Sequence, residues 1–387
     1  MNTDLQTILP TDPRAGYRAH EEEIRQAIQG VLDAGTYILG SEVAGFEREF
    51  AAYLGVRSAI GVASGTDALY LALLSCGLRP GDGVLTVSHT AVATIAAIEM
   101  AGAIPILIDV DPLTHTLDPD RLEDACDEYR ALSAEVSMKA IVAVHLYGHP
   151  ADMTALQEIA SRYDLFVIED CAQAHGSAIE GVKTGSWGAI GAFSFYPTKN
   201  LPALGDAGAI VTNHPDFGER ARMLREYGWR ERYVSQLPGT NSRLDEIQAA
   251  ILRVRLRHLE AENQRRRELA GLYSDQLRDL PLVLPIARGQ VSHVYHQYVI
   301  QTSSRDELRR YLDSRRIKTL VHYPVPVHLQ PAYRDRLPIH RAGLPRTERL
   351  SAEILSLPMH PFLTEAQATR VVEEIRGFYG RGGSRPT

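Results

Sequence analysis

The chain has 387 residues, of which 44% are hydrophobic and 23% are charged. This length allows about two or three domains, and the apolar share is enough for a large buried core, which excludes a disordered tail protein. The 41 basic and 48 acidic residues give a formal net charge of −7, which argues against nucleic acid and anionic membranes as partners. Three cysteines, 50 and 45 positions apart, fit neither a disulfide framework nor a paired metal motif and predict a reducing compartment.

We expect no cleaved secretion signal in the N-terminal segment. Residues 1–13 include Asp4 and Asp12 and lack a basic start followed by an apolar stretch. The most apolar stretch, residues 84–108, is interrupted by His89, Glu99 and Pro105, and it falls short of the roughly 18 uninterrupted apolar residues that a spanning helix needs. We therefore expect a cytoplasmic protein without a membrane span.

Short β-rich runs alternate with helical patterns between residues 58 and 212. The sequence predicts strands at 59–62, 84–87, 104–109, 140–145, 165–169, 189–195 and 209–212. Apolar residues at helical spacing predict helices between them at 68–74, 92–100 and 153–163. This alternation is typical of an α/β fold in which helices cover a mostly parallel sheet.

The rest of the chain predicts a second, smaller unit. Residues 216–227 form a helical pattern, and residues 243–280 form a long one. The remaining pattern is enough for a small α+β unit, with segments at 291–300, 305–315 and 317–322 and late helices around 347–355 and 364–378. We therefore predict a large domain over residues 1–260 and a small domain over 261–387, with a frayed tail from Gly380.

Familiar nucleotide and protease motifs are missing. The sequence has no GxGxxG after the first strand, no GxxxxGK[ST], no HExxH and no GxSxG. Asp109-Val110-Asp111 has the Asp-x-Asp form with which some glycosyltransferases hold a metal and a nucleotide sugar. Such a triplet at a strand end also simply opens a turn. A metal-dependent glycosyltransferase is therefore kept as an alternative, although we expect no metal site.

A polar loop, Ser64-Gly65-Thr66-Asp67, follows the first predicted strand and opens a helix. Gly65 allows the backbone to approach a ligand closely, and Thr66 offers a hydroxyl. Free N–H groups at a helix start attract anions such as phosphate. The same four residues also fit an ordinary helix N-cap.

Acidic residues end the apolar strand at 165–168. A carboxylate such as Asp170, placed beyond the carboxyl end of such a strand, faces the ligand crevice of an α/β sheet. There it could keep a proton on a heteroaromatic nitrogen, and Gln173 could bond a ring oxygen. A lone strand-end aspartate also serves as a turn former.

Lys199 lies between a predicted strand and a Gly-rich turn, after Phe193, Ser194, Phe195 and Tyr196. Lysine is the residue that captures a cofactor aldehyde as a Schiff base. The neighbouring aromatic residues predict a largely apolar approach that lowers the pKa of the amine. A solvated loop lysine is the competing interpretation.

The chain resembles the DegT/DnrJ-type sugar aminotransferases, which use pyridoxal phosphate (PLP) on the fold type I scaffold. Besides the three pieces above, the resemblance rests on motifs spread over nearly the whole chain: Val144-His145-Leu146-Tyr147-Gly148-His149-Pro150, Gly239-Thr240-Asn241-Ser242-Arg243-Leu244-Asp245-Glu246-Ile247-Gln248-Ala249-Ala250 and His322-Tyr323-Pro324-Val325-Pro326-Val327-His328.

The resemblance implies a role for each matching residue. Lys199 holds PLP and moves the proton between the amino donor and the cofactor, while Asp170 pairs with the ring nitrogen. Gln173 lies near the ring hydroxyl. The phosphate is held by Gly65, Thr66 and Ser194 and, because the family shares its site across a homodimer, by Asn241 of the neighbouring subunit. The sugar lies near His322 and Tyr323.

Three departures from the family pattern stand out. The family usually has an aromatic residue at the position of Ala91, where the side chain covers one face of the cofactor ring; His89, two positions earlier, is the candidate substitute and is placed with the substrate residues. Pro202 and Ala207 replace smaller residues and change loop shape more than chemistry. Lys199 itself is retained, which disfavours the dehydratase relatives that carry histidine there.

The resemblance implies a ping-pong transaminase. Glutamate, or alternatively glutamine, gives its amine to PLP, and the aminated cofactor then converts a ketone on a nucleotide-linked deoxysugar. The match over residues 319–333 favours carbon 3 of a dTDP-linked 3-keto-6-deoxyhexose over carbon 4 of a 4-keto sugar. A non-enzymatic regulator that binds DNA or a protein partner is the alternative of another class.

Overall fold

The structure is a computed structural model that describes residues 7–131, 137–287 and 289–380. Its centre is a seven-stranded sheet of order β1-β9-β8-β5-β4-β2-β3. Strand β9 runs antiparallel to both of its neighbours, and the other pairs are parallel. The strands are β1 (Ser58–Val62), β2 (Gly83–Val87), β3 (Ile104–Ile108), β4 (Met138–Val144), β5 (Phe166–Asp170), β8 (Ile190–Ser194) and β9 (Gly208–Thr212). All seven predicted strands are present, which confirms the mostly parallel mixed sheet.

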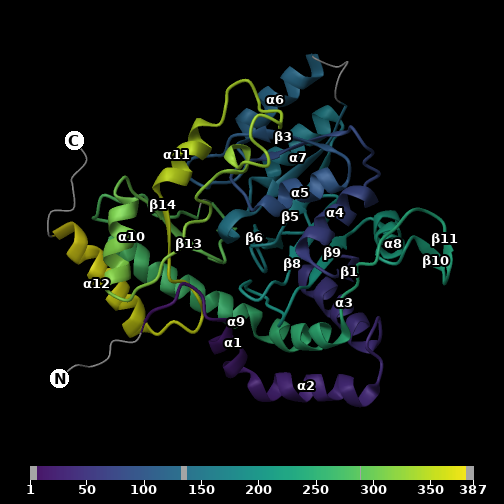
Figure 1. The fold of residues 1–387 in the computed structure, drawn as a ribbon, viewed down its shortest axis with the longest axis horizontal. Helices are drawn as coiled ribbons and strands as arrows, with labels where there is room; N and C mark the ends of the chain where they lie inside the picture. Colours follow the sequence, from purple (N-terminus) through teal and green to yellow (C-terminus); the bar gives the residue numbers. More distant parts are fainter. Residues whose placement is uncertain (1–6, 132–136, 288, 381–387) are drawn as a thin grey trace.

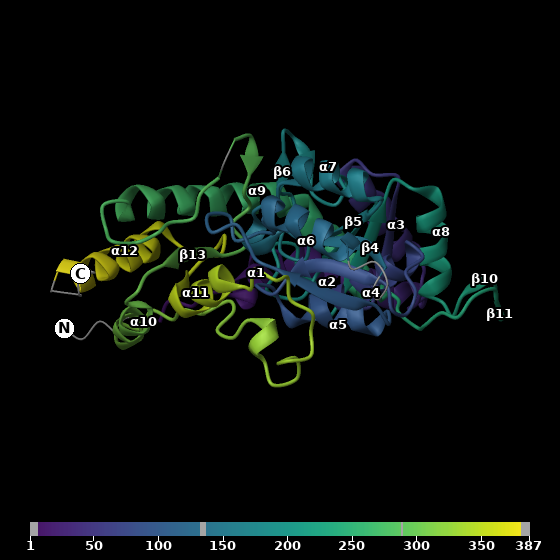
Figure 2. The same cartoon turned by 90° about the horizontal axis from the view of Figure 1, so that it is seen from above.

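Helices enclose this sheet in Figures 1 and 2. Because side chains alternate along a strand, β8 turns Ile190 toward the core that contains α4 and Phe193 toward α3. The Phe193 ring meets Phe50 of α3 edge to face at 5.1 Å. The helices of this part are α1 (Pro13–Ala19), α2 (Glu21–Ala34), α3 (Ser41–Leu54), α4 (Gly65–Ser75), α5 (Val92–Met100), α6 (Pro119–Ala131), α7 (Met153–Tyr163) and α8 (Pro215–Leu224).

The long helix α9 (Glu246–Leu277) joins this part to the C-terminal elements. It passes without a break through the predicted domain boundary at residue 260, so that boundary stays a prediction. A separate apolar cluster begins along α9 at Leu269 and includes Ile8 from the N-terminal segment. The C-terminal elements are α10 (Arg305–Ser314), α11 (Pro345–Glu353), α12 (Glu365–Gly380) and the antiparallel pair β13 (Tyr298–Gln301) and β14 (Ile354–Leu357).

One C-terminal prediction needs correction. The predicted helix at 347–355 ends early, because Ile354 and Leu355 begin β14 and pair with β13. The segment at 291–300, to which the sequence assigned no element type, contains β12 (Val291–Ser292) and β13, which belong to different sheets. Pairing with distant strands decides these short segments. The predicted fraying of the tail concerns residues 381–387, which lie outside the described part of the chain.

Short strands and turns complete the chain. Strand β6 (Ala178–Ile179) pairs with both β12 and β7 (Val182–Lys183), and the single turns η1 (Leu146–Gly148) and η2 (Val327–Leu329) border the central sheet. Strands β10 (Trp229–Glu231) and β11 (Val234–Ser235) form a hairpin that projects from the body in both views (Figures 1 and 2). No helix among the described residues is long and apolar enough to cross a membrane.

Candidate active site

Lys199 lies in the turn between β8 and β9, close to the carboxyl end of β8. The turn is tied by Lys199 N–H, which donates to Tyr196 O at 2.8 Å, and by Ala203 N–H, which donates to Phe195 O at 2.8 Å. Burial lowers the pKa of the Lys199 amine to about 8, although the nearby Asp170 carboxylate raises it.

The source of this burial differs from the aromatic approach that the sequence suggested. Phe193 and Phe195 pack into the core with α3, and Tyr196 is 52% exposed. The three aromatic rings therefore do not form a wall around Lys199, which is itself half-buried by surface area.

Asp170, the last residue of β5, is held at both carboxylate oxygens. Its Oδ2 accepts from Thr94 Oγ1 at 2.9 Å, and its Oδ1 accepts from Ala172 N–H at 3.1 Å. The Thr94 hydroxyl also bonds the Thr90 hydroxyl at 2.9 Å. Thr94 was not singled out by the sequence, because its partner lies 76 positions away. The carboxylate is therefore fixed in orientation before any ligand arrives.

Gln173, His322 and Tyr323 meet in one network, together with Tyr147. Gln173 Oε1 accepts from Tyr147 N–H at 2.7 Å, and Gln173 Nε2 donates to the Tyr323 hydroxyl at 3.1 Å. The Tyr147 hydroxyl donates to the carbonyl oxygen of His322. Residues predicted from two distant motifs are thus brought together, and Tyr147 is a bridging residue that sequence reasoning missed.

The pKa values of His322 and Tyr323 show that these side chains lie near Lys199 and Asp170. Burial, helped by the charge of Lys199, lowers the pKa of His322 to about 4. Burial, helped by the charge of Asp170, raises the pKa of Tyr323 to about 12. Both side chains are therefore neutral near pH 7 and act through hydrogen bonds rather than charge.

His89 supports Tyr147. Its Nε2 lies 2.8 Å from the Tyr147 hydroxyl, and because that hydroxyl donates to His322, the imidazole carries its proton on Nε2. Burial lowers the pKa of His89 to about 3, and the side chain has no exposed surface. His89 therefore contacts protein on every side, while Ala91 is the N-cap of α5.

A tight cradle forms where α4 meets the sheet. A Cβ added at Gly65 would lie 2.4 Å from Ser194 Cβ, so only glycine permits this approach of α4 to β8. Ser64 caps the helix, since its Oγ accepts from Asp67 N–H at 3.1 Å. The N-cap interpretation is thus correct, and it coexists with a half-buried helix start at Gly65 and Thr66 that suits an anion.

Asn241 lies on the surface beside this cradle. Its neighbour Ser242 donates from Oγ to Asp67 Oδ2 at 2.7 Å, which ties the segment to α4. Asn241 itself is exposed and forms an isolated bridge with Glu226 at the base of the β10–β11 hairpin.

The Asp109-Val110-Asp111 triplet serves the fold. Asp109 Oδ1 accepts from Thr347 N–H at 2.9 Å and from Thr347 Oγ1 at 2.8 Å, and Oδ2 accepts from Arg346 N–H at 2.9 Å. Asp111 Oδ1 accepts from two N–H groups of its own turn, at 2.8 Å each. The carboxylates hold the start of α11 and a turn, as turn-forming residues do.

The fold, the buried lysine and the facing aspartate define a class of aminotransferase. Residues 18–376 match the family model described as the DegT/DnrJ/EryC1/StrS aminotransferase family, and the chain belongs to this family.

Similar proteins agree with this assignment. The chain is 47% identical to the dTDP-3-amino-3,4,6-trideoxy-alpha-D-glucose transaminase of Streptomyces venezuelae, over 94% of each chain. It is 44% identical to the erythromycin biosynthesis sensory transduction protein EryC1 of Saccharopolyspora erythraea, over 94% of this chain and 98% of the relative. The crystal structure of S. venezuelae DesV with a ketimine intermediate has a TM-score of 0.92 at 46% identity and covers 98% of this chain and 100% of its own. The protein is therefore an aminotransferase of α/β fold type I, as predicted.

The family is PLP-dependent in general. One solved structure with the same fold, NtdA from Bacillus subtilis, contains bound PMP, the aminated form of the cofactor. It has a TM-score of 0.87 at 30% identity and covers 97% of this chain and 86% of its own.

Proposed function

We propose that the protein uses PLP to transfer the amino group of glutamate to carbon 3 of a dTDP-linked 3-keto-6-deoxyhexose. The observation that carries this proposal is the buried Lys199 amine, whose pKa is lowered to about 8 beside a carboxylate that is fixed at both oxygens. A buried lysine of this kind is a nucleophile and a proton carrier near neutral pH.

The chain's own groups fit the cofactor at three places. The glycine cradle at Gly65 and Ser194, with Thr66 beside it, suits the phosphate. Asp170 suits the protonated ring nitrogen, because an opposite charge stabilises the protonated form. Gln173 uses its carbonyl oxygen for Tyr147 and one amide N–H for Tyr323, which leaves its second amide N–H as the group that can donate to a ring oxygen.

Each residue then has a defined task in the reaction. When bound, PLP supplies the aldehyde that carries the amino group and the electron-poor ring that acidifies the donor's α-carbon. Lys199 removes the proton from that carbon and returns it. Compared with an ordinary lysine of pKa 10.5, a pKa of about 8 raises the neutral fraction of the amine at pH 7 roughly 300-fold. Asp170, held by Thr94, maintains the proton on the ring.

The sugar is assigned from the relatives and from the small-domain residues. Relatives from S. venezuelae, Aneurinibacillus thermoaerophilus and Micromonospora megalomicea are named as transaminases of dTDP-3-amino sugars, which favours carbon 3 over carbon 4. We assign His322 and Tyr323 to the sugar, and His89 supports His322 through the Tyr147 hydroxyl, which donates to the His322 carbonyl oxygen.

We propose a homodimer with a shared site. Asn241 is exposed at the base of a projecting hairpin, where Tyr233 is 73% exposed and Val234 is 49% exposed. Aromatic and aliphatic side chains on such a projection suit burial against a second subunit. Asn241 would then reach the phosphate of the partner's cofactor. The cytoplasmic location stays a prediction from the sequence.

Labelling and product analysis test the proposal together. After loading with PLP and reduction with borohydride, the peptide that contains Lys199 should carry the mass of the cofactor, and the label should disappear in Lys199→Ala but persist in Lys183→Ala. Incubation with glutamate or glutamine and with dTDP-linked 3-keto or 4-keto sugars, followed by NMR, identifies the donor and the carbon. An unlabelled Lys199, or a biological function that survives Lys199→Ala, would favour a non-enzymatic regulator.

A further inference from the structure

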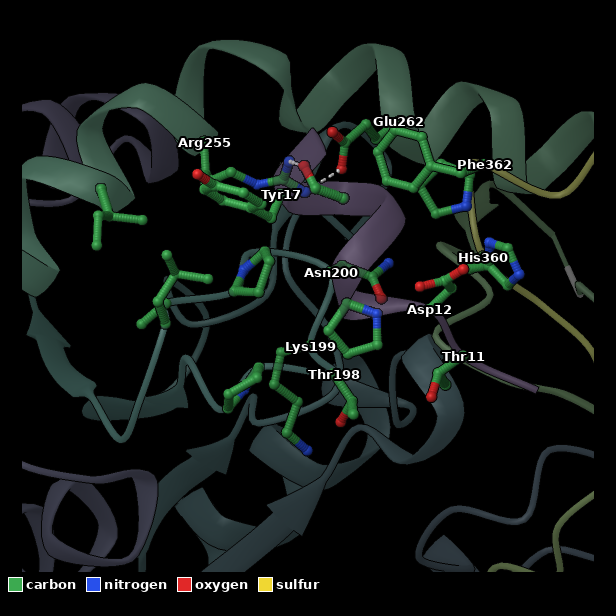
Figure 3. Close-up of a pocket in the computed structure, with 18 of the residues that line it drawn as sticks. Thr11, Asp12, Tyr17, Thr198, Lys199, Asn200, Arg255, Glu262, His360 and Phe362 are labelled. Carbon is green, nitrogen blue, oxygen red and sulfur yellow. Dashed lines mark hydrogen bonds and ion pairs between the residues drawn. The ribbon is translucent and has the colours of Figure 1, made fainter. Parts of the chain in front are cut away.

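A second cavity borders the lysine loop. The cavity has a volume of about 40 Å³ and lies between the loop at residues 197–204, the N-terminal segment, α9 and residues 360–362. Asp170, Gln173, Ser194 and Gly65 do not line it. In Figure 3, the Lys199 side chain runs away from the bonded pair Arg255 and Glu262, so its amine is directed out of this cavity. The cavity therefore shares the loop of Lys199 with the candidate active site but not its other residues.

Arg266 is a buried cation in this cavity. It is 5% exposed, and its Nη1 donates only to the carbonyl oxygens of Tyr295 at 3.3 Å and Met359 at 3.1 Å. Within the described part of the chain, no carboxylate forms an ion pair with it, and its Nε has no hydrogen-bond partner. Burial lowers the pKa of Arg266 to about 10, so the group is still charged at neutral pH. Buried charges in proteins are ordinarily paired.

The carboxylates near Arg266 are already engaged. Glu262 accepts from Arg255 Nη2 at 2.9 Å and lies 2.9 Å from His20 Nε2. Asp12, which faces His360 in Figure 3, caps α1 by accepting from Ala15 N–H at 2.9 Å. The charge of Glu262 partly offsets the effect of burial on the pKa of Arg266, but neither carboxylate forms a hydrogen bond or ion pair with it among the described residues.

Two further nitrogen atoms of the cavity lining are buried without a hydrogen-bond partner, like Arg266 Nε. Arg255 Nε and His360 Nδ1 are buried, and across the described ranges neither has a hydrogen-bond partner. Arg255 is 5% exposed and His360 is 8% exposed. Three unsatisfied nitrogen atoms, two of them guanidinium donors, thus belong to side chains around one cavity. Each buried donor left without an acceptor has a free-energy cost.

We propose that this cavity binds a small oxyanion, either a carboxylate or a phosphate, through Arg266, Arg255 and His360. A planar oxyanion suits the guanidinium group because it accepts two parallel N–H bonds. The bound anion compensates the charge of Arg266 and supplies acceptors to Arg255 and His360.

Occupancy of the cavity links three parts of the chain. Arg255 Nη1 already donates to Gly16 O of the N-terminal segment at 2.8 Å, and Arg266 holds residue 359. The remaining wall, at residues 197–204, carries Lys199. An anion here therefore fastens the N-terminal segment and α9 behind the loop of the reactive lysine, and we expect it to stabilise the folded protein.

Crystals of the full chain locate the anion directly. Soaking in sodium bromide should give an anomalous peak beside Arg266 and His360, and growth in phosphate should give tetrahedral density at the same place. Cavity density explained by water alone under both conditions would overturn the proposal.

Titration in solution measures the binding. Inorganic phosphate and acetate, titrated separately by calorimetry at constant ionic strength, distinguish a phosphate site from a carboxylate site. Arg266→Gln should weaken binding of the better probe by about tenfold or more, since it removes a charged donor. Arg267→Gln makes the same change one position along, at a residue that does not line the cavity, and should leave the affinity unchanged.

A second variant covers the case in which Arg266→Gln does not fold. His360→Phe keeps an aromatic ring of similar shape and removes Nδ1, and it should also weaken binding while circular dichroism stays native. Equal affinity in wild type, His360→Phe and a folded Arg266→Gln protein would overturn the proposal, because binding would then occur elsewhere.

Discussion

Replacing Thr94 with valine tests the hydrogen bond that fixes Asp170. Valine is close to threonine in shape, so the change mainly removes the hydroxyl that donates to Asp170 Oδ2 at 2.9 Å. Thr94 is 1% exposed, so solvent does not readily replace the lost donor. A hydrogen bond to a charged group contributes about 1.5–3 kcal/mol, which corresponds to a roughly 10- to 150-fold change. We expect kcat/KM for transamination to fall by about this factor.

The assay is steady-state amine transfer with PLP in excess, and cofactor binding is measured in parallel. Thr94→Ser keeps the hydroxyl and should retain most activity. Thr86→Val is the matched control, because Thr86 is equally buried but donates to the carbonyl oxygen of Val142 at 3.0 Å; it should lower stability without a comparable loss of rate. Wild-type kcat/KM in Thr94→Val would refute the inference that this hydroxyl orients the carboxylate.

Three other changes test the cradle, the lysine and the aspartate triplet. Gly65→Ala places a Cβ 2.4 Å from Ser194 Cβ, and we expect a loss of about 1–3 kcal/mol in unfolding free energy and weaker PLP binding by titration. In the cofactor-free protein, Lys199 has its pKa lowered from 10.5 to about 8, so the unfolded state binds more protons between these pH values. Burying the charged lysine therefore lowers the unfolding free energy of wild type by about 3 kcal/mol below pH 8, and this cost disappears as the pH rises toward 10.5. Thermal melts should show that Lys199→Met is more stable than wild type below pH 8 and that the difference shrinks between pH 8 and 10.5. Asp109→Ala removes three hydrogen bonds at the start of α11 and should lower stability by about 1–3 kcal/mol, while EDTA leaves wild-type activity unchanged.

Each of these has a clear contrary result. Gly30→Ala, where nothing lies within 4 Å of the added Cβ, should stabilise α2 by about 0.5–1 kcal/mol. If Gly65→Ala also stabilised the protein, a clash between the added Cβ and Ser194 would be refuted. A pH-independent difference between Lys199→Met and wild type would mean that the lysine is not buried as a titrating group. Activity abolished by EDTA and restored by Mn²⁺ would return the Asp109 triplet to a metal role.

The candidate residues of the site were visible in the sequence because each belongs to a local pattern. Asp170 ends an apolar strand, Lys199 precedes a Gly-rich turn, and Gly65 opens a helix directly after a strand. In a parallel sheet the carboxyl ends of the strands meet at one edge, so residues in these positions were expected to be neighbours. The structure places all three on that edge.

The hydrogen-bond partners of these residues could be identified only from the tertiary structure. Thr94 holds Asp170 from 76 positions away, and Tyr147, which bonds Gln173, also bonds His322, which lies 175 positions after Tyr147. The Asp-x-Asp triplet was ambiguous for the same reason, since the helix start that Asp109 caps lies 237 positions further on. Hydrogen bonds between residues so far apart in the sequence produce no periodic pattern from which they could be predicted.

The sequence by itself determined the strand order along the chain, the helix-covered sheet and the lysine–aspartate pair, because hydrophobic period and turn chemistry act over a few residues. Only the tertiary structure decided which side chains orient that pair, how the C-terminal strands pair and where the buried arginines face a cavity. These features depend on contacts between segments far apart in the chain, whose geometry is set by packing of the whole molecule.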